Sequence, residues 1–208
     1  MLKFESFPAG ALGVNCSLVW DPAEAKGVVI DPGGDAARIA RRVEELGFQV
    51  VELLHTHGHF DHIGATRALQ TAWGCPAYLH EADDFLLADL DMQTGLFGMP
   101  PVERPEMLPL QAGEIRFGFK VLHTPGHSPG GCCFLGEVEQ GPIVFTGDSL
   151  FQGGVGRTDL MGGHWEQLEA SIRRELFTLD DATIAVPGHG PLTTIGREAR
   201  SNPYVRRG

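Results

Sequence analysis

The stretch His57-Gly58-His59-Phe60-Asp61-His62 decides how the rest of this sequence is interpreted. It directly follows the apolar run VVELL at residues 50–54, which is typical of a buried strand. Imidazole and carboxylate groups are ligands suited to zinc, iron or manganese. In an extended segment, side chains two residues apart point to the same side, so the first two histidines can share one ion. The Asp-His pair follows a turn and can face a neighbouring ion. The stretch therefore predicts a metal centre at the end of a strand.

Three more apolar strands run into loops of the same character. FKVL (119–122) leads into HTPGH, PIVFT (142–146) into GDS, and TIAV (183–186) into PGHGP. Strand ends that carry such loops tend to open on one mouth of a sheet. We therefore expect each loop to bring one further ligand to the same place. These ligands are His127, Asp148 and His189.

Hydrophobic periodicity places strands and helices along the whole chain. Asp35 is expected to cap a helix over residues 36–46 that ends at Gly47. The other helices are expected at 63–73, 81–92 and 164–178, with an irregular segment at 98–109. Strands are expected at 2–7, 14–20, 27–30, 50–54, 77–79, 114–122, 131–136, 142–146 and 183–186. This mixture favours an α/β (α+β) fold with sheets covered by helices, in one domain spanning residues 1–208.

Composition excludes several classes of function. The chain has 208 residues, 16 Lys and Arg against 27 Asp and Glu, and a formal charge of -11, so a phosphate-binding face for nucleic acid is not expected. No apolar run is long enough to span a membrane, and the start MLKFESFPAG does not resemble a secretory signal. The four cysteines form no C-x-x-C pair. We expect them to be reduced thiols of a cytoplasmic protein, at positions Cys16, Cys75, Cys132 and Cys133.

The H-x-H-x-D-H run with a later His, Asp and His resembles the metallo-β-lactamase superfamily over nearly the whole chain. The resemblance implies a four-layer αββα sandwich with a metal site at one edge of the two sheets. It also implies two zinc ions per chain, with iron or manganese as alternatives. Carried over residue by residue, the ligands of the first ion are His57, His59 and His127, those of the second are Asp61, His62 and His189, and Asp148 bridges the two.

Three longer segments resemble the short bacterial glyoxalase II-like hydrolases. They are TPGHSPG (124–130), FTGDSLFQGGVGRTD (145–159) and PGHGPLTTIGREARSNPY (187–204). The resemblance implies hydrolysis of a small, anionic thioester of the hydroxyacylglutathione type, in which a metal-bridging hydroxide attacks the carbonyl and Asp61 and Asp148 are catalytic. A thiol leaves as a thiolate without a strong general acid, which favours thioesters over amides. β-Lactamases usually carry Cys or Ser at the position of Asp148.

Two other activities fit the same motifs. Persulfide dioxygenases share the H-x-H-x-D-H run and a GRTD segment like 156–159, and would hold one iron through His57, His127 and Asp148. The PGHGP loop resembles the hydrolases more closely. A lactonase or esterase of the same fold would use the same site chemistry.

The remaining candidates have weaker support from the sequence. Arg157 is expected to bind an anionic part of the substrate, or else to pair with a carboxylate such as Asp159. Asp31, at the end of the strand GVVI, either stabilises a turn or orients a ligand histidine. The chain ends at Gly208, soon after His189, so we expect one short helix there and only part of the glutathione pocket of full-length glyoxalase II. Four histidines are expected to be structural: His55, His80, His123 and His164.

Overall fold

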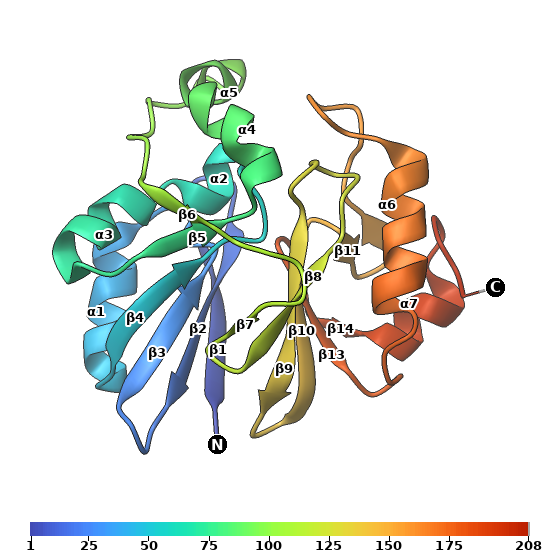
Figure 1. Cartoon of the computed structure of the whole chain (residues 1–208), viewed down its shortest axis with the longest axis horizontal. Coiled ribbons are helices and arrows are strands. Elements are labelled where there is room, and N and C mark those ends of the chain that lie inside the picture. Colours follow the sequence, from blue (N-terminus) through green and yellow to red (C-terminus); the bar gives the residue numbers. More distant parts are fainter. Residues whose placement is uncertain (208) are drawn as a thin grey trace.

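The computed structural model describes residues 1–207 and contains two six-stranded sheets packed face to face (Figure 1). The first sheet has the order β1-β2-β3-β4-β5-β6. Pairing is antiparallel from β1 to β3 and parallel from β3 to β6. Its strands are β1 (Lys3–Ala9), β2 (Val14–Asp21), β3 (Lys26–Ile30), β4 (Gln49–Leu54), β5 (Ala77–Leu79) and β6 (Met107–Pro109).

The second sheet has the order β14-β13-β10-β9-β8-β7, with β10 and β13 parallel and its other pairs antiparallel. A small hairpin of β11 (Leu150–Phe151) and β12 (Gly154–Val155) extends from β10. The strands of the sheet are β7 (Ile115–Arg116), β8 (Phe119–His123), β9 (Cys132–Val138), β10 (Gly141–Gly147), β13 (Ile184–Pro187) and β14 (Thr193–Thr194).

Helices cover the outer face of each sheet and complete the four layers that the family resemblance predicts (Figure 1). The first sheet is covered by α1 (Ala36–Leu46) and α3 (Thr66–Trp73). The second is covered by α6 (Trp165–Ser171), which continues into the π-helical turn η2 (Ile172–Leu176), and by α7 (Ile195–Ser201). Four short helices lie along one edge: α2 (Phe60–Ile63), η1 (Glu81–Asp83), α4 (Asp84–Ala88) and α5 (Leu90–Leu96).

Three apolar layers follow from the alternation of side chains along the strands. Between the sheets lie Phe119, Phe134 and Phe145, all buried. The opposite face of the first sheet packs on α1 and α3. The opposite face of the second sheet packs on α6, η2 and α7, where Leu168 and Ile172 are completely buried. Because both faces of both sheets are covered, open space for a ligand is left at the edges where the loops emerge. Within residues 1–207, no helix combines the length and apolarity needed to cross a bilayer.

Several local predictions were wrong. Asp35 is the N-cap residue of α1, but its side chain makes no capping bond; its φ is 55° and its carboxylate instead accepts a hydrogen bond from the amide of Gly10 at 3.0 Å. The strand predicted at 114–122 is a hairpin of β7 and β8, because Phe117 and Gly118 both adopt positive φ and form a two-residue turn. The helix predicted at 81–92 is divided into η1, α4 and α5, and the segment 98–109 contains β6.

Candidate metal centre

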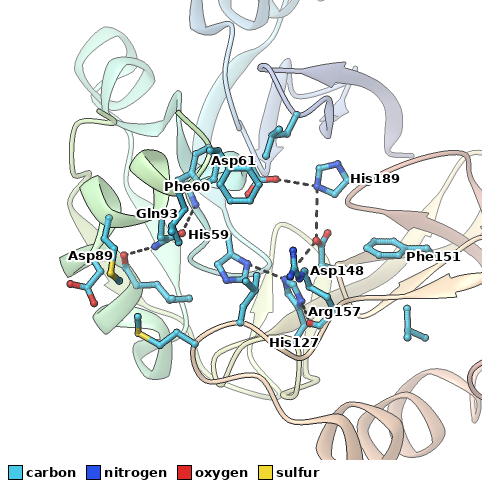
Figure 2. A pocket seen from close by; sticks show the side chains of 18 residues that line it. His59, Phe60, Asp61, Asp89, Gln93, His127, Asp148, Phe151, Arg157 and His189 are labelled. Atoms are coloured by element: carbon cyan, nitrogen blue, oxygen red, sulfur yellow. Dashed lines mark hydrogen bonds and ion pairs between the residues drawn. The ribbon is translucent and has the colours of Figure 1, made fainter. Parts of the chain in front are cut away.

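All of the predicted ligands come together at the edge of the sandwich where β4, β8, β10 and β13 end. In the second sheet, β8, β10 and β13 share one direction, because β10 and β13 pair in parallel and β9 is antiparallel to both β8 and β10. The loops that follow them therefore emerge side by side. Figure 2 shows His59, His127, Asp148 and His189 converging on one cavity.

Three overlapping groups of side chains have their ligand atoms within 4.8 Å of one another. The ring nitrogens of His59 and His127 are 3.0 Å apart. This separation suits a hydrogen bond between the two rings, and it also suits two ligands of one cation. The groups are His57, His59 and His127; His57, His62 and Asp148; and Asp61, His62 and His189.

Asp148 lies between the two halves of this cluster. Its Oδ1 is 3.3 Å from Nε2 of His62, and its Oδ2 is 3.6 Å from Nε2 of His127 and 3.9 Å from Nε2 of His189. On the other side, Oδ2 of Asp61 is 3.1 Å from Nε2 of His189. A single carboxylate thus reaches both groups, as a bridging ligand must.

Three atoms of the cluster provide a direct test of whether a cation fits. Nε2 of His57, Nε2 of His62 and Oδ1 of Asp148 are buried and have no hydrogen-bond partner. Buried polar atoms are almost always paired, and leaving them unpaired is costly. Divalent cations would supply the missing partners for all three. The nitrogen and oxygen donors fit zinc, iron or manganese and do not suit calcium, which prefers oxygen ligands alone.

Burial and neighbouring charges place His57, His59 and Asp148 in the protonation states that metals require, whereas nearby carboxylates outweigh burial and raise the pKa of His62. Burial lowers the pKa of His59 to about 3, with a smaller contribution from His127 in the same direction. Burial also lowers the pKa of His57 well below its ordinary value. For Asp148 burial favours the neutral acid, but His62, His127 and His189 outweigh it and lower the pKa of the carboxyl. His57 and His59 are therefore neutral, and Asp148 is a carboxylate.

A layer of hydrogen bonds behind the cluster orients its rings. Asp31 accepts from the amide of Thr56 at 2.8 Å and from its hydroxyl at 2.6 Å, and from Nδ1 of His62 at 3.0 Å. Nδ1 of His127 donates to the carbonyl of Arg157 at 2.7 Å. A proton on Nδ1 leaves Nε2 of the same ring free to bind a cation. The sequence suggested that Asp31 either stabilises a turn or orients a ligand histidine. The structure shows the contact with His62 that the second role requires.

Asp83 is a buried residue of the site that sequence reasoning missed. Its carboxylate accepts from the amide of Gly58 at 2.9 Å, the hydroxyl of Ser128 at 2.8 Å and the amide of Gly130 at 2.6 Å. These contacts join the loop of His57 and His59 to the loop of His127. The sequence carried no signal for this role, because one aspartate near the start of a predicted helix resembles an ordinary capping residue.

The residues with weaker support in the sequence have the following positions. The guanidinium of Arg157 is exposed and pairs with Asp159 through two hydrogen bonds of 2.7 Å. The other histidines contribute no atom to the three groups described above. His55 is buried against Tyr78 and Thr66, His80 and His123 stack on each other, and His164 is exposed beside Glu166.

A cavity of about 450 Å³ opens directly onto the cluster. His59, Asp61, His127, Asp148 and His189 form its floor, and apolar side chains form most of its walls (Figure 2). A cluster of metal-ligand type at the base of such a cavity is the arrangement expected of a metalloenzyme active site.

Comparison with known proteins identifies the family. Residues 9–189 match the model of the metallo-beta-lactamase superfamily. A hydroxyacylglutathione hydrolase, GloC, of Haemophilus influenzae is 44% identical over 98% of both chains. A crystal structure described as BLEG-1 B3 metallo-beta-lactamase has a TM-score of 0.89 at 36% identity and covers 98% of this chain and 99% of its own. A di-iron-bound form of TTHA1623 has a TM-score of 0.88 at 39% identity, over 97% of this chain and all of the other.

These matches confirm the predicted αββα architecture and the predicted resemblance to glyoxalase II-like proteins. The relatives are similar in length to this chain, so the likeness extends over the whole fold and includes the edge that carries the cluster. The family model, the relatives and the clustered His and Asp side chains together show that the chain belongs to the metallo-β-lactamase superfamily of metal-dependent hydrolases.

Proposed function

We propose that the protein is a dinuclear metal-dependent hydrolase of a small thioester of the hydroxyacylglutathione type. The observation that carries the proposal is the position of Asp148, whose carboxylate reaches ligand groups on both sides of the cluster. The relative named hydroxyacylglutathione hydrolase supports the thioester substrate. We assign His57, His59 and His127 to one ion, Asp61, His62 and His189 to the second, and Asp148 to both.

Each residue of the cluster has a defined task in this assignment. His57, His59 and His127 present ring nitrogens to the first ion. Burial keeps His57 and His59 from being protonated, and the bond from Nδ1 of His127 to the carbonyl of Arg157 leaves its Nε2 available. Asp61 and Asp148 add two negative charges that offset the charge of the cations. When bound, two divalent cations supply Lewis acidity and a water with a pKa of about 7 instead of 15.7. We assign zinc as the native metal, and the di-iron form of a relative makes iron the principal alternative.

The lining of the cavity favours a thioester over an amide. An amine leaves only after it is protonated, whereas a thiol with a pKa of about 8.5 leaves readily as its anion. Among the described residues, the lining groups that could donate such a proton are the proposed metal ligands and Asp89, and no Lys, Tyr, Ser or Cys side chain is present there. The chemistry that this site supports without further groups is therefore the release of a good leaving group.

Two further assignments accompany this proposal. Arg157 lies on the cavity lining, where its guanidinium could contact a carboxylate of the substrate after exchanging its bond with Asp159. The four cysteines are buried free thiols, which supports a cytoplasmic protein.

The test combines metal analysis with three assays on the same preparation. The proposal expects close to two metal equivalents per chain, hydrolysis of S-lactoylglutathione, no oxygen uptake with glutathione persulfide, and no comparable turnover of a penicillin. One iron per chain with oxygen uptake would instead establish the dioxygenase activity. Penicillin hydrolysis without thioester hydrolysis would assign the activity named for the B3 structural relative.

A further inference from the structure

One wall of the cavity is apolar and solvent-exposed, although the proposed chemistry requires only a polar floor. We define the apolar wall as Met92, Leu96 and Phe97 from α5 and the residue after it, together with Leu12, Phe151 and Met161. Leu96 is 76% exposed and Phe97 is 49% exposed. Isolated apolar residues are common on protein surfaces, but a group gathered around a cavity marks a binding surface.

The apolar wall is built onto the metal cluster. The ring of Phe97 packs against that of Phe60 with 5.3 Å between centroids, and Phe60 stands between His59 and Asp61. Gln93 fixes α5 in place, since its side chain accepts from the amide of Phe60 at 3.0 Å and donates to the carbonyl of Leu86 at 2.7 Å. A group attached to a carbonyl at the cluster would therefore extend along this wall.

Within residues 1–207, the same lining offers an anionic tail a single cationic contact, Arg157, which lies outside the apolar wall. Among the described residues around the cavity, Arg157 is the one Lys or Arg side chain, and Asp159 already engages its guanidinium. Asp89 adds a carboxylate near α5. Recognition by this wall must therefore come mainly from the burial of apolar surface.

Resting on the proposed hydrolase function, we infer that the preferred substrates carry an apolar group, such as a medium-length alkyl chain, beside the scissile thioester carbonyl. The apolar wall is the subsite for that group, and the floor of the cavity holds the carbonyl. The apolar group could belong to the acyl part or to the thiol part of the thioester. Two series of substrates distinguish these possibilities.

The experiment measures kcat/KM for thioesters without ionic groups, using the metal-loaded protein. One series runs from acetyl to hexanoyl on N-acetylcysteamine, and the other joins acetate to thiols from ethanethiol to hexanethiol. Burial of one methylene is worth about two- to fourfold in kcat/KM. The hexanoyl-to-acetyl ratio, or the hexyl-to-ethyl ratio, should therefore be at least about tenfold. A rise in either series identifies the side that meets the wall, and ratios near one in both series overturn the inference.

Variants connect the chain-length effect to the wall. Leu96→Ser with Phe97→Ser should reduce the ratio to about threefold or less, whereas Leu96→Met should keep it. Ile115→Ser is the matched control, because Ile115 is 66% exposed on β7 and is not part of the cavity lining. As a measurement independent of turnover, the hexyl thioether of N-acetylcysteamine should bind the wild type at least about tenfold more tightly than the ethyl thioether. Equal affinities would contradict the subsite. Hydrolysis of S-lactoylglutathione without chain-length dependence would refute only the subsite, whereas failure to hydrolyse any thioester would refute the proposed function.

Discussion

Asp31 holds His62 from behind, with 3.0 Å between Oδ2 of the aspartate and Nδ1 of the histidine. The two side chains come from loops that follow neighbouring parallel strands, β3 and β4. Asp31 has a φ of 50°, which lies in the left-handed region where aspartate, asparagine and histidine are the most frequent residues after glycine. The turn aims the Asp31 carboxylate at the ring of His62, where it accepts the proton on Nδ1, so that Nε2 faces the cluster.

This contact predicts the effect of Asp31→Asn. Asparagine tolerates the positive φ, but its amide group cannot accept the Nδ1 proton in the same way. Part of the His62 population should then carry its proton on Nε2, where it blocks a cation. Metal affinity should fall about 10–100-fold, measured by competition with a chelator. Asp35→Asn is the control, because Asp35 has a similar φ of 55° and contacts Gly10 instead. Equal losses in both variants would point to the backbone as the cause.

Asp148→Ala should remove the carboxylate shared by both ligand groups. We expect one metal equivalent to be lost and kcat/KM to fall at least about 100-fold, since a bridging ligand should matter more than residues that only orient ligands. His164→Ala should change neither quantity, because that side chain is exposed beside Glu166. Elemental analysis of both variants, with circular dichroism to confirm folding, provides the comparison. Retention of two equivalents in Asp148→Ala would show that the assignment is wrong.

Gly188→Ala tests how tightly the cluster is enclosed. A Cβ at this position would overlap Oδ1 of Asp148 and lie 2.7 Å from the ring of His62, so the carboxylate would have to move. Metal content should fall although no ligand has been changed. Gly95→Ala has open space around its Cβ and should keep its metal. An alanine at position 188 with wild-type metal content would mean that Asp148 can relocate without loss of binding.

Asp83→Ala should destabilise the fold as well as the site. The substitution leaves the donors of Gly58, Ser128 and Gly130 without their shared acceptor in a buried environment. Loss of such partners should lower the free energy of unfolding by at least about 2 kcal/mol. Urea denaturation of the metal-free protein measures this separately from metal binding. Asp84→Ala changes an exposed neighbour and should cost much less. Similar values for the two variants would show that the Asp83 contacts contribute little.

Substitutions of Arg157 and Asp159 should have opposite effects on the KM for an anionic thioester. Asp159 competes with any substrate carboxylate for the guanidinium, and the pair lowers the pKa of Asp159 to about 2. Arg157→Ala should raise KM for an anionic thioester several-fold, and Asp159→Asn should lower it. An uncharged thioester should respond to neither substitution. If both variants lose activity on both substrates, the pair has only a structural role in its loop.

The sequence allowed the fold and the cluster to be predicted because their signals are local. The run from His57 to His62 and the apolar strands before the other loops are visible as short patterns, and strand direction then brings their ends together. Asp83 could not be found in this way, because its role depends on contacts with Gly58 and Ser128, which are distant in sequence. The hairpin at Phe117 and the division of α4 from α5 were missed because backbone conformation at single residues decides them.

The cluster also joins two parts of the chain that are separate in sequence. Residues 57–62 emerge from the first sheet, whereas His127, Asp148 and His189 emerge from the second. Cations bound there would cross-link the two sheets at their open edge and would be absent from the unfolded chain. At a free metal concentration 1,000 times the Kd, one such site adds about 4.1 kcal/mol to the free energy of unfolding. Metal supply would therefore contribute to the stability of the folded protein as well as to its activity.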